Sequence, residues 1–95
     1  MLNSLFITLE GIEGVGKSTA VETVASTMIS IGKDVLVTRE PGGTKIGEKL
    51  RRIILDNNEP LTPTEEILLL MTSRLNHINN IIKPALKYNK IVISD

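Results

Sequence analysis

The sequence predicts an α/β fold, in which a parallel sheet carries helices on both of its faces. Three short, largely apolar runs rich in strand-forming residues, at 5–9, 35–38 and 91–94, are separated by segments whose apolar residues recur at helical spacing. Continuous apolar runs of this kind are typical of strands buried on both faces. Because strands that alternate with helices pair in parallel through right-handed crossovers, we expect helices on both sides of one sheet.

The first half of the chain is predicted to form a strand, a helix and a second strand. Leu5–Leu9 is an apolar run that stops at a glycine-rich stretch, and Val35–Thr38 is the second such run. The intervening helix, Lys17–Ile31, is predicted by one apolar stripe and by Gly32, which stands where a left-handed C-cap falls. The residues expected in the stripe are Val21, Val24, Ala25, Met28 and either Ile29 or Ile31.

Two further helices are predicted before the last strand. Gly47–Leu55 has apolar residues at helical spacing, and the polar stretch 56–60 ends it. Thr62 is expected to cap the third helix, with Pro63 at the first helical position and Glu65 completing a capping box.

The third helix is expected to run to about Lys87. Pro84 is expected to kink or divide it, since proline has no amide to donate to the preceding turn. The apolar run Ile67–Met71 is expected to be core, and His77 to be a surface or partly packed residue without a role.

Composition narrows the classes of function. A chain of 95 residues with 41% apolar content suits one compact domain, expected over residues 1–95. Eleven basic residues balance eleven acidic ones, so a nucleic-acid partner is not expected. No apolar stretch approaches the ~20 residues of a membrane span and no signal segment is evident, which predicts no membrane partner and a cytoplasmic location. The absence of cysteine and the single histidine exclude disulfides and a zinc cluster.

One motif carries specific chemistry. Residues 11–18, Gly-Ile-Glu-Gly-Val-Gly-Lys-Ser, fit the P-loop pattern G-x-x-x-x-G-K-[ST] between a predicted strand and a predicted helix. Backbone amides and the helix N-terminus then bind phosphate, Lys17 adds a cation for the β- and γ-phosphates, and Ser18 places a hydroxyl on Mg²⁺. A glycine turn in an ordinary loop is the simpler alternative, but chance seldom gives this pattern in this context. The expected ATP-binding residues are Gly11, Ile12, Glu13, Gly14, Val15, Gly16, Lys17, Ser18 and Thr19.

The motif makes the predicted fold a three-layer sheet of the P-loop NTPase type, incomplete in this chain. Polar residues gather at the same edge of that sheet. The segment Thr38–Thr44 follows the second strand, Arg51 and Arg74 stand on the next helices, and Asp95 closes the third strand. Arginine binds phosphate as a bidentate fork, so this group predicts a second anionic substrate beside the first.

Four segments resemble those of the bacterial thymidylate kinases. They are, in order along the chain, Phe6–Thr19, Thr38–Thr44, Ser73–Arg74 and Val92–Asp95. The resemblance covers the whole chain. It implies ATP-dependent phosphorylation of dTMP to dTDP, a step of dTTP biosynthesis, with Mg²⁺ as cofactor and a homodimer in the full-length protein.

The resemblance also implies roles for individual residues. Arg39 and Arg51 would contact the phosphate side of dTMP, and Arg74 would hydrogen-bond the thymine ring. Glu13, inside the P-loop, would face the dTMP sugar. Asp95 matches the aspartate of the family's Asp-Arg motif, which lies beside the phosphates and the metal.

Lys17 and Asp95 are therefore the expected catalytic residues, and Asp95 is expected to assist Ser18 at the metal. The sequence departs from the family pattern at Leu70, where relatives carry an aromatic ring that stacks on thymine and this chain offers apolar surface instead. The arginine of the Asp-Arg motif, the lid and the adenine-contacting loop are not in this sequence. We expect the N-terminal part of a kinase, with impaired catalysis by this part alone.

Two other functions stay open on the sequence. The first is a nucleotide-binding module that does not transfer phosphate. The second is a P-loop enzyme with a different acceptor, either another nucleotide or water in a GTPase reaction. The segment Arg39–Gly43 argues against a GTPase, and turnover of ATP with dTMP separates the kinase from the non-catalytic module.

Overall fold

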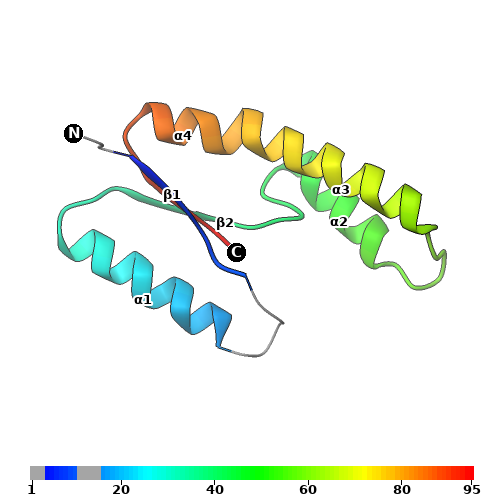
Figure 1. Cartoon of the computed structure of the whole chain (residues 1–95), viewed down its shortest axis with the longest axis horizontal. Helices are drawn as coiled ribbons and strands as arrows, with labels where there is room; N and C mark the ends of the chain where they lie inside the picture. The colour runs from blue at the N-terminus through cyan, green and yellow to red at the C-terminus, as the bar shows by residue number, and fades with distance from the viewer. Residues whose placement is uncertain (1–3, 11–15) are drawn as a thin grey trace. The chain divides into compact units, whose positions relative to one another are not determined.

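The structure, a computed structural model, describes residues 4–10 and 16–95, so residues 11–15 of the phosphate motif lie outside the described residues. The chain forms two compact units, Met1–Thr38 with Ile82–Asp95 and Arg39–Ile81. The first unit contains the sheet, and the second contains a pair of helices (Figure 1).

The first unit is built on a three-stranded parallel sheet, which confirms the expected α/β class. Its strands are β1 (Leu5–Thr8), β2 (Val35–Thr38) and β3 (Ile91–Ser94). The spatial order is β1-β3-β2, so the last strand in the sequence is the middle one. Each outer strand pairs with β3 in parallel, with Thr8 and Thr38 both opposite Ser94 at the carboxyl ends.

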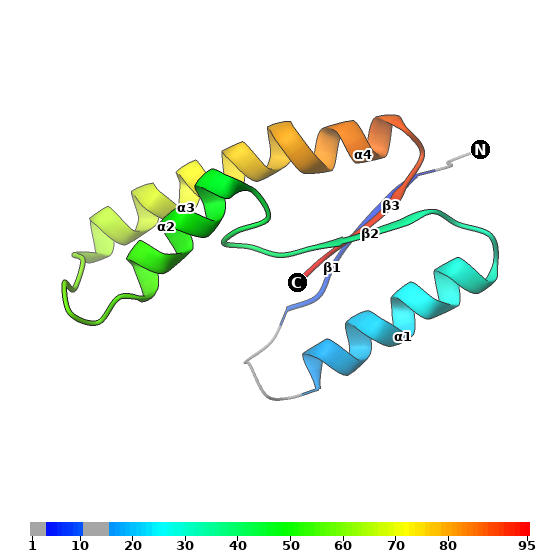
Figure 2. The same ribbon diagram turned by 180° about the vertical axis from the view of Figure 1, so that it is seen from behind.

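Helices cover both faces of this sheet, which gives the expected three layers. The helix α1 (Lys17–Ser30) lies on one face and α4 (Lys83–Lys87) on the other, as the two opposite views agree (Figures 1 and 2). All four residues of β3 are buried, and Val92 and Ile93 are 0% exposed. Burial on both faces explains why this strand is apolar throughout rather than alternating.

The core of the first unit lies between α1 and the sheet. Val21 of α1 packs with Ile91 and Ile93 of β3. Partly buried residues packed against them are Ile7, Leu9, Val24, Ala25, Met28 and Val35. The expected stripe of α1 is confirmed up to Met28, but its proposed last members are wrong, because Ile29 and Ile31 are 60% and 64% exposed. The helix ends at Ser30, so Ile31 lies at the C-cap beyond its apolar stripe, and Ile29 lies off the stripe.

Gly32 ends α1, as the sequence predicts. Its φ is 86°, its amide donates to Ile29 O at 2.9 Å, and the Lys33 amide donates to Met28 O at 3.1 Å. This is the Schellman pattern of a left-handed residue after the helix, here followed by β2. Asn89, with φ 61°, plays the same part between α4 and β3.

The second unit packs α2 (Lys45–Leu55) against α3 (Pro63–His77). The helix α2 begins two residues before the expected start at Gly47, because Thr44 caps it and accepts a 2.8 Å hydrogen bond from the Gly47 amide. Gly47 also allows a close approach, since a Cβ there would lie 2.6 Å from Gly42 O. The start of α2 is thereby packed directly on the backbone of the loop that precedes it.

The capping box of α3 is confirmed. The Glu65 amide donates to Thr62 Oγ1 at 3.2 Å, and the Thr62 amide donates to Glu65 Oε1 at 2.9 Å. The Thr62 amide is the main cause that lowers the pKa of the Glu65 carboxyl. The expectation that Ile67–Met71 is core is wrong, because Ile67, Leu68 and Met71 are 57%, 61% and 62% exposed. Five consecutive residues surround a helix, and α2 covers only one side of it.

The helical residues that follow α3 form a π-helical turn, η1 (Ile78–Ile82), and then α4. Helix does extend to Lys87, as expected, and the division comes at the π turn just before Pro84. Proline has no amide to donate to the carbonyl of residue 80, and its ring crowds that carbonyl. A widened turn at this point relieves both effects.

Candidate active site

The phosphate side of the site begins where the described chain resumes. Gly16 has φ 84° and ψ 15° and stands at the N-cap of α1. A Cβ there would meet no atom of the described residues within 4 Å, and the left-handed backbone by itself favours glycine. Lys17 is the first residue of α1, and the amides of its first turn have no acceptor within the helix, an arrangement that favours an anion. The expected residues outside the described part of the chain are Gly11, Ile12, Glu13, Gly14 and Val15.

The two predicted catalytic residues meet at the carboxyl end of the sheet. Lys17 Nζ lies 2.8 Å from Asp95 Oδ1, and the two side chains are 20% and 33% exposed. The Asp95 amide donates to Thr38 O at 2.9 Å, which extends the β2–β3 ladder by one residue. The carboxylate is therefore fixed by a strand end and the ammonium by a helix start.

The oxygen ligands expected for Mg²⁺ stand close to this pair in the chain. Ser18 and Thr19 follow Lys17 in the first turn of α1, and both are exposed. Asp95 Oδ1 is buried and, beyond the Lys17 ammonium, makes no aligned hydrogen bond to a described residue. Hydroxyl and carboxylate oxygens are the hard ligands that Mg²⁺ prefers, with water and substrate phosphate completing its shell. The described residues hold no cluster of three or more His, Cys, Asp or Glu for a metal held by protein alone.

In the second unit, Glu48 organises the loop that follows β2. Arg39 donates to its two carboxylate oxygens, from Nε at 3.1 Å and from Nη2 at 2.7 Å, and the Gly43 amide donates to Oε1 at 3.2 Å. The Arg39 hydrogen bond, followed by that of Gly43, lowers the pKa of Glu48 to about 2. Gly42 has φ 136°, and a Cβ there would lie 2.6 Å from Glu48 Oε1. Sequence reasoning missed Glu48, although an acidic residue in the first turn of α2 was a visible signal.

Arg51 supports the same loop from α2. Its Nη1 donates to Pro41 O at 3.0 Å. Arg39 and Arg51 are thus both engaged with their own chain in this structure, one through a carboxylate and one through a carbonyl. Their contact with the phosphate side of dTMP stays a prediction.

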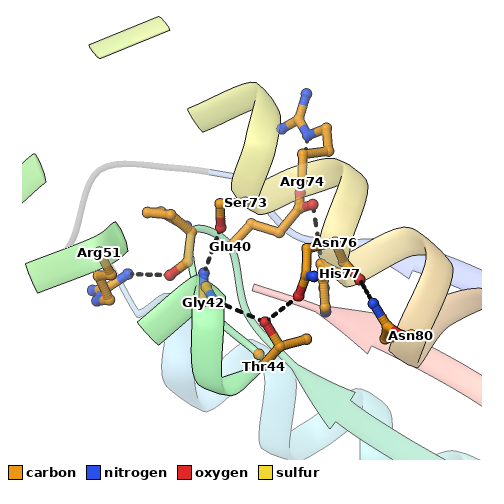
Figure 3. A network of polar contacts seen from close by, with 12 residues as sticks. Glu40, Gly42, Thr44, Arg51, Ser73, Arg74, Asn76, His77 and Asn80 are labelled. Atoms are coloured by element: carbon orange, nitrogen blue, oxygen red, sulfur yellow. Dashed lines mark hydrogen bonds and ion pairs between the residues drawn. The ribbon is translucent and has the colours of Figure 1, made fainter. Parts of the chain in front are cut away.

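One face of α3 holds this loop through two hydrogen bonds, one to its backbone and one to a side chain (Figure 3). Ser73 Oγ accepts from the Gly42 amide at 3.3 Å, and Thr44 Oγ1 donates to Asn76 Oδ1 at 2.6 Å. Ser73 is 1% exposed, so its hydroxyl is buried with its partner. The loop is consequently fixed to α3 at two points along its length.

Glu40 lies between two further residues of that face. Its Oε1 is 3.2 Å from His77 Nδ1, and its Oε2 accepts from Arg74 Nε at 3.3 Å (Figure 3). His77 is 0% exposed, so our expectation of a surface or partly packed residue is wrong. It stands three residues after Arg74 and therefore on the helix face that the loop covers. A single histidine gives no periodic signal from which this burial was predictable.

A cavity of about 190 Å³ is lined by residues of the loop and of α3. Its walls are Glu40, Pro41, Leu70, Met71 and Arg74. Two residues predicted to bind dTMP, Leu70 and Arg74, therefore share one cavity. Leu70 and Met71 supply apolar surface and Glu40 and Arg74 supply charge, a combination typical of small-molecule sites.

The predicted site residues are divided between the two units. The first unit holds Lys17, Ser18, Thr19 and Asp95, and the second holds Arg39, Arg51, Leu70 and Arg74. Within the first unit the expected catalytic pair is in contact, and within the second the two base-side residues line the same cavity. The polar residues that sequence reasoning did not anticipate, Glu48 and His77, both hold residues of the loop.

Comparison with known proteins identifies a consistent group of relatives. The family model described as thymidylate kinase matches residues 9–95 of this chain. The thymidylate kinase of Halothermothrix orenii is 46% identical over 94 residues, which are 99% of this chain and 45% of that protein. The thymidylate kinase of Geotalea uraniireducens is 47% identical over 91 residues, which are 95% of this chain and 43% of that protein.

A solved structure agrees with this result. The crystal structure of thymidylate kinase from Ehrlichia chaffeensis superposes with a TM-score of 0.87 at 40% identity, covering 97% of this chain and 52% of that one. The backbone of the described chain is therefore that of the P-loop NTPase type, as the motif predicts. The chain spans about half the length of the relatives that it matches.

Proposed function

The chain belongs to the thymidylate kinase family, and on that premise we propose that the protein transfers the γ-phosphoryl group of ATP to dTMP. The product is dTDP, which leads to dTTP. The observation that carries the proposal is the 2.8 Å ion pair between Lys17 Nζ and Asp95 Oδ1 at the start of α1. We further propose that both compact units belong to one kinase domain over residues 1–95.

ATP is proposed to place its phosphates on the first turn of α1. The amides after Gly16 have no acceptor within the helix, and the positive end of the helix dipole favours an anion there. Lys17 exchanges part of its contact with Asp95 for the β- and γ-phosphates. Transfer of a phosphoryl group requires alignment and neutralisation of charge, which these groups supply without a covalent nucleophile. Residues 11–15 complete the loop according to the sequence pattern.

Ser18 and Asp95 are proposed to hold Mg²⁺, which when bound neutralises charge on the phosphate oxygens. The buried Asp95 Oδ1, which lies 2.8 Å from Lys17 Nζ and makes no other hydrogen bond to a described residue, supports this assignment because a carboxylate oxygen has the capacity to accept a further partner. The Ser18 hydroxyl is exposed one residue after Lys17, where a phosphate-bound ion is within reach.

The acceptor nucleotide is proposed to place its base in the cavity of the second unit. Leu70, with Met71 beside it, covers the face of the base, and Arg74 hydrogen-bonds its edge. The shared cavity supports both roles. Arg39 and Arg51 are proposed to contact the phosphate side of dTMP, and the motif position of Glu13 favours a contact with the sugar.

Binding of ATP tests the phosphate side. Isothermal titration calorimetry in the presence of Mg²⁺ is expected to show binding that Lys17→Ala weakens about tenfold or more, since a charge-assisted contact is lost. Lys87→Ala, an exposed lysine at the end of α4, is the matched control and should bind ATP as the wild type does. ATP binding that is unaffected by Lys17→Ala would remove the basis of the proposal.

Turnover tests the reaction and its acceptor. We expect the complete gene product to form dTDP from dTMP with ATP and Mg²⁺, and Arg74→Ala to lower kcat/KM for dTMP. dUMP, dCMP and dGMP serve as competing acceptors. ATP binding without turnover of any nucleotide would indicate the non-catalytic module, and preference for another nucleotide would change the acceptor.

Assembly and location complete the proposal. We propose a homodimer, which the exposed apolar residues Ile67, Leu68 and Leu75 of α3 support, since burial against a second copy removes them from water. Sedimentation should show a dimer that Leu68→Lys shifts towards monomer.

No helix among the described residues is long and apolar enough to cross a membrane. We propose a cytoplasmic location because ATP and dTMP are found there.

A further inference from the structure

Glu40 connects a buried imidazole to an exposed guanidinium. Its two carboxylate oxygens take different partners, His77 Nδ1 at 3.2 Å and Arg74 Nε at 3.3 Å. The side chains become more exposed along this series, from 0% for His77 through 21% for Glu40 to 65% for Arg74 (Figure 3). An exposed arginine is thus attached, through one carboxylate, to a residue that packing holds in place.

The contact through Nε determines what Arg74 has left to offer. A guanidinium held at Nε keeps both terminal nitrogens for another partner, and within the described part of the chain neither takes part in a hydrogen bond or ion pair. Arg74 lines the cavity together with Glu40 and Leu70. The plane of the guanidinium, and with it the direction of its donors, therefore follows the orientation of the Glu40 carboxylate.

The orientation of Glu40 is fixed in turn by His77. A carboxylate oxygen accepts and does not donate, so His77 Nδ1 carries the proton of this bond. The loop has its own attachments to α3, from the Gly42 amide to Ser73 and from the Thr44 hydroxyl to Asn76. Loss of the His77 contact accordingly releases the Glu40 side chain while the loop stays attached.

We propose that His77 is a positioning residue that, through Glu40, sets the guanidinium of Arg74 for the nucleobase of the acceptor. The inference rests on the proposed acceptor role of Arg74. It extends that role to a residue that is fully buried and does not line the cavity. His77 acts by restricting the orientations of Arg74 before the nucleotide arrives, so that less freedom is lost on binding.

Two substitutions separate this role from simple packing. His77→Phe removes the donor and keeps a planar ring, whereas His77→Asn keeps a side-chain nitrogen two bonds from Cβ, where Nδ1 stands. Asn80→Ala is the matched control from the π turn, because Asn80 is exposed and its side chain donates to the Asn76 carbonyl at 2.9 Å, away from Glu40.

The first measurement needs no nucleotide. We expect the NMR signal of the Arg74 Nε–H to exchange slowly with solvent in the wild type and in Asn80→Ala. His77→Phe should shift this signal and accelerate its exchange, and His77→Asn should restore it. An Arg74 signal unchanged by His77→Phe would overturn the proposal.

The second measurement uses the complete gene product. His77→Phe should raise KM for dTMP by about tenfold, equivalent to one charge-assisted hydrogen bond, and leave KM for ATP unchanged. In an Arg74→Ala background the same substitution should add nothing, because the residue that it positions is gone. An equal rise in both KM values, or an undiminished effect without Arg74, would show a merely structural role.

If His77→Phe does not fold, Glu40→Gln replaces it in both measurements. Glu40→Gln keeps the shape of the bridge and removes its charge, and it should give the same rise in KM for dTMP and the same change in the Arg74 signal. If no dTMP binding is seen in the wild type, the acceptor assignment fails, and the NMR measurement still decides whether His77 holds Arg74.

Discussion

Glu48 is the residue on which the loop 39–44 depends most directly, because it binds Arg39 and the Gly43 amide at once. Its partly buried side chain has its ordinary pKa of 4.5 in the unfolded chain and about 2 in the folded one. The folded carboxylate therefore adds stability above the unfolded pKa. That stability is lost as the pH falls through the folded pKa.

Unfolding at acid pH tests whether the stability contributed by Glu48 is lost in this direction. We expect the free energy of unfolding, measured with denaturant, to decrease between about pH 4.5 and pH 2 in part because of Glu48. Glu48→Gln should lower stability at neutral pH and flatten this part of the profile. Glu59→Gln, which changes an exposed carboxylate in the segment between α2 and α3, should leave the profile unchanged.

Gly16 and Gly32 form a natural pair for comparison. Both have left-handed backbones, with φ of 84° and 86°, and a Cβ added at either position would meet no atom of the described residues within 4 Å. Alanine at either position should lower the free energy of unfolding by about 1 kcal/mol for the same backbone reason. Only Gly16→Ala should also weaken ATP binding in calorimetry, and equal weakening by Gly32→Ala would contradict the proposed phosphate site.

The ends of the helices were predicted best, because the residues that determine them are neighbours in the sequence. Thr62, Pro63 and Glu65 fixed the start of α3, and Gly32 fixed the end of α1, each through hydrogen bonds among neighbours in the chain. The start of α2 was predicted two residues late, since Thr44 caps it without the glutamate of a capping box. At Pro84 the sequence predicted only a kink or a division of the helix, and not the π-helical turn that precedes it.

Substitution of Thr62 measures how much the N-cap of α3 contributes to the free energy of unfolding. Thr62→Ala removes the acceptor of the Glu65 amide and should lower the free energy of unfolding by about 1 kcal/mol. Thr64→Ala, an exposed residue in the same first turn, is the control and should have little effect. Thermal unfolding followed by circular dichroism measures both, and equal losses would show that the cap contributes nothing.

For the molecule as a whole, the P-loop pattern identified the fold class, but it did not determine which segments are in contact. The order β1-β3-β2 depends on contacts between distant segments, and no local pattern encodes it. Exposure of Ile67 and Leu68 was missed because an apolar sequence does not say what covers it. The same reason hid His77, whose partner Glu40 lies 37 positions away in the sequence.

The site was predictable to the extent that the motif fixes it. Lys17 and Asp95 were expected together and are in contact, and Leu70 and Arg74 share a cavity. The carboxylates that hold the arginines, Glu40 and Glu48, were not assigned that task in advance. A ligand-binding arginine is visible in a motif, whereas the acid that orients it depends on packing.

The place of β3 in the middle of the sheet has a consequence for synthesis. While the chain is emerging from a ribosome, β1 and β2 have no partner in each other, since each pairs only with β3 among the described strands. The sheet can form only after Ile91–Ser94 has left the exit tunnel of the ribosome. Until then the apolar strands β1 and β2 remain exposed and can be bound by chaperones. A chain truncated before residue 91 would lack the strand that joins them.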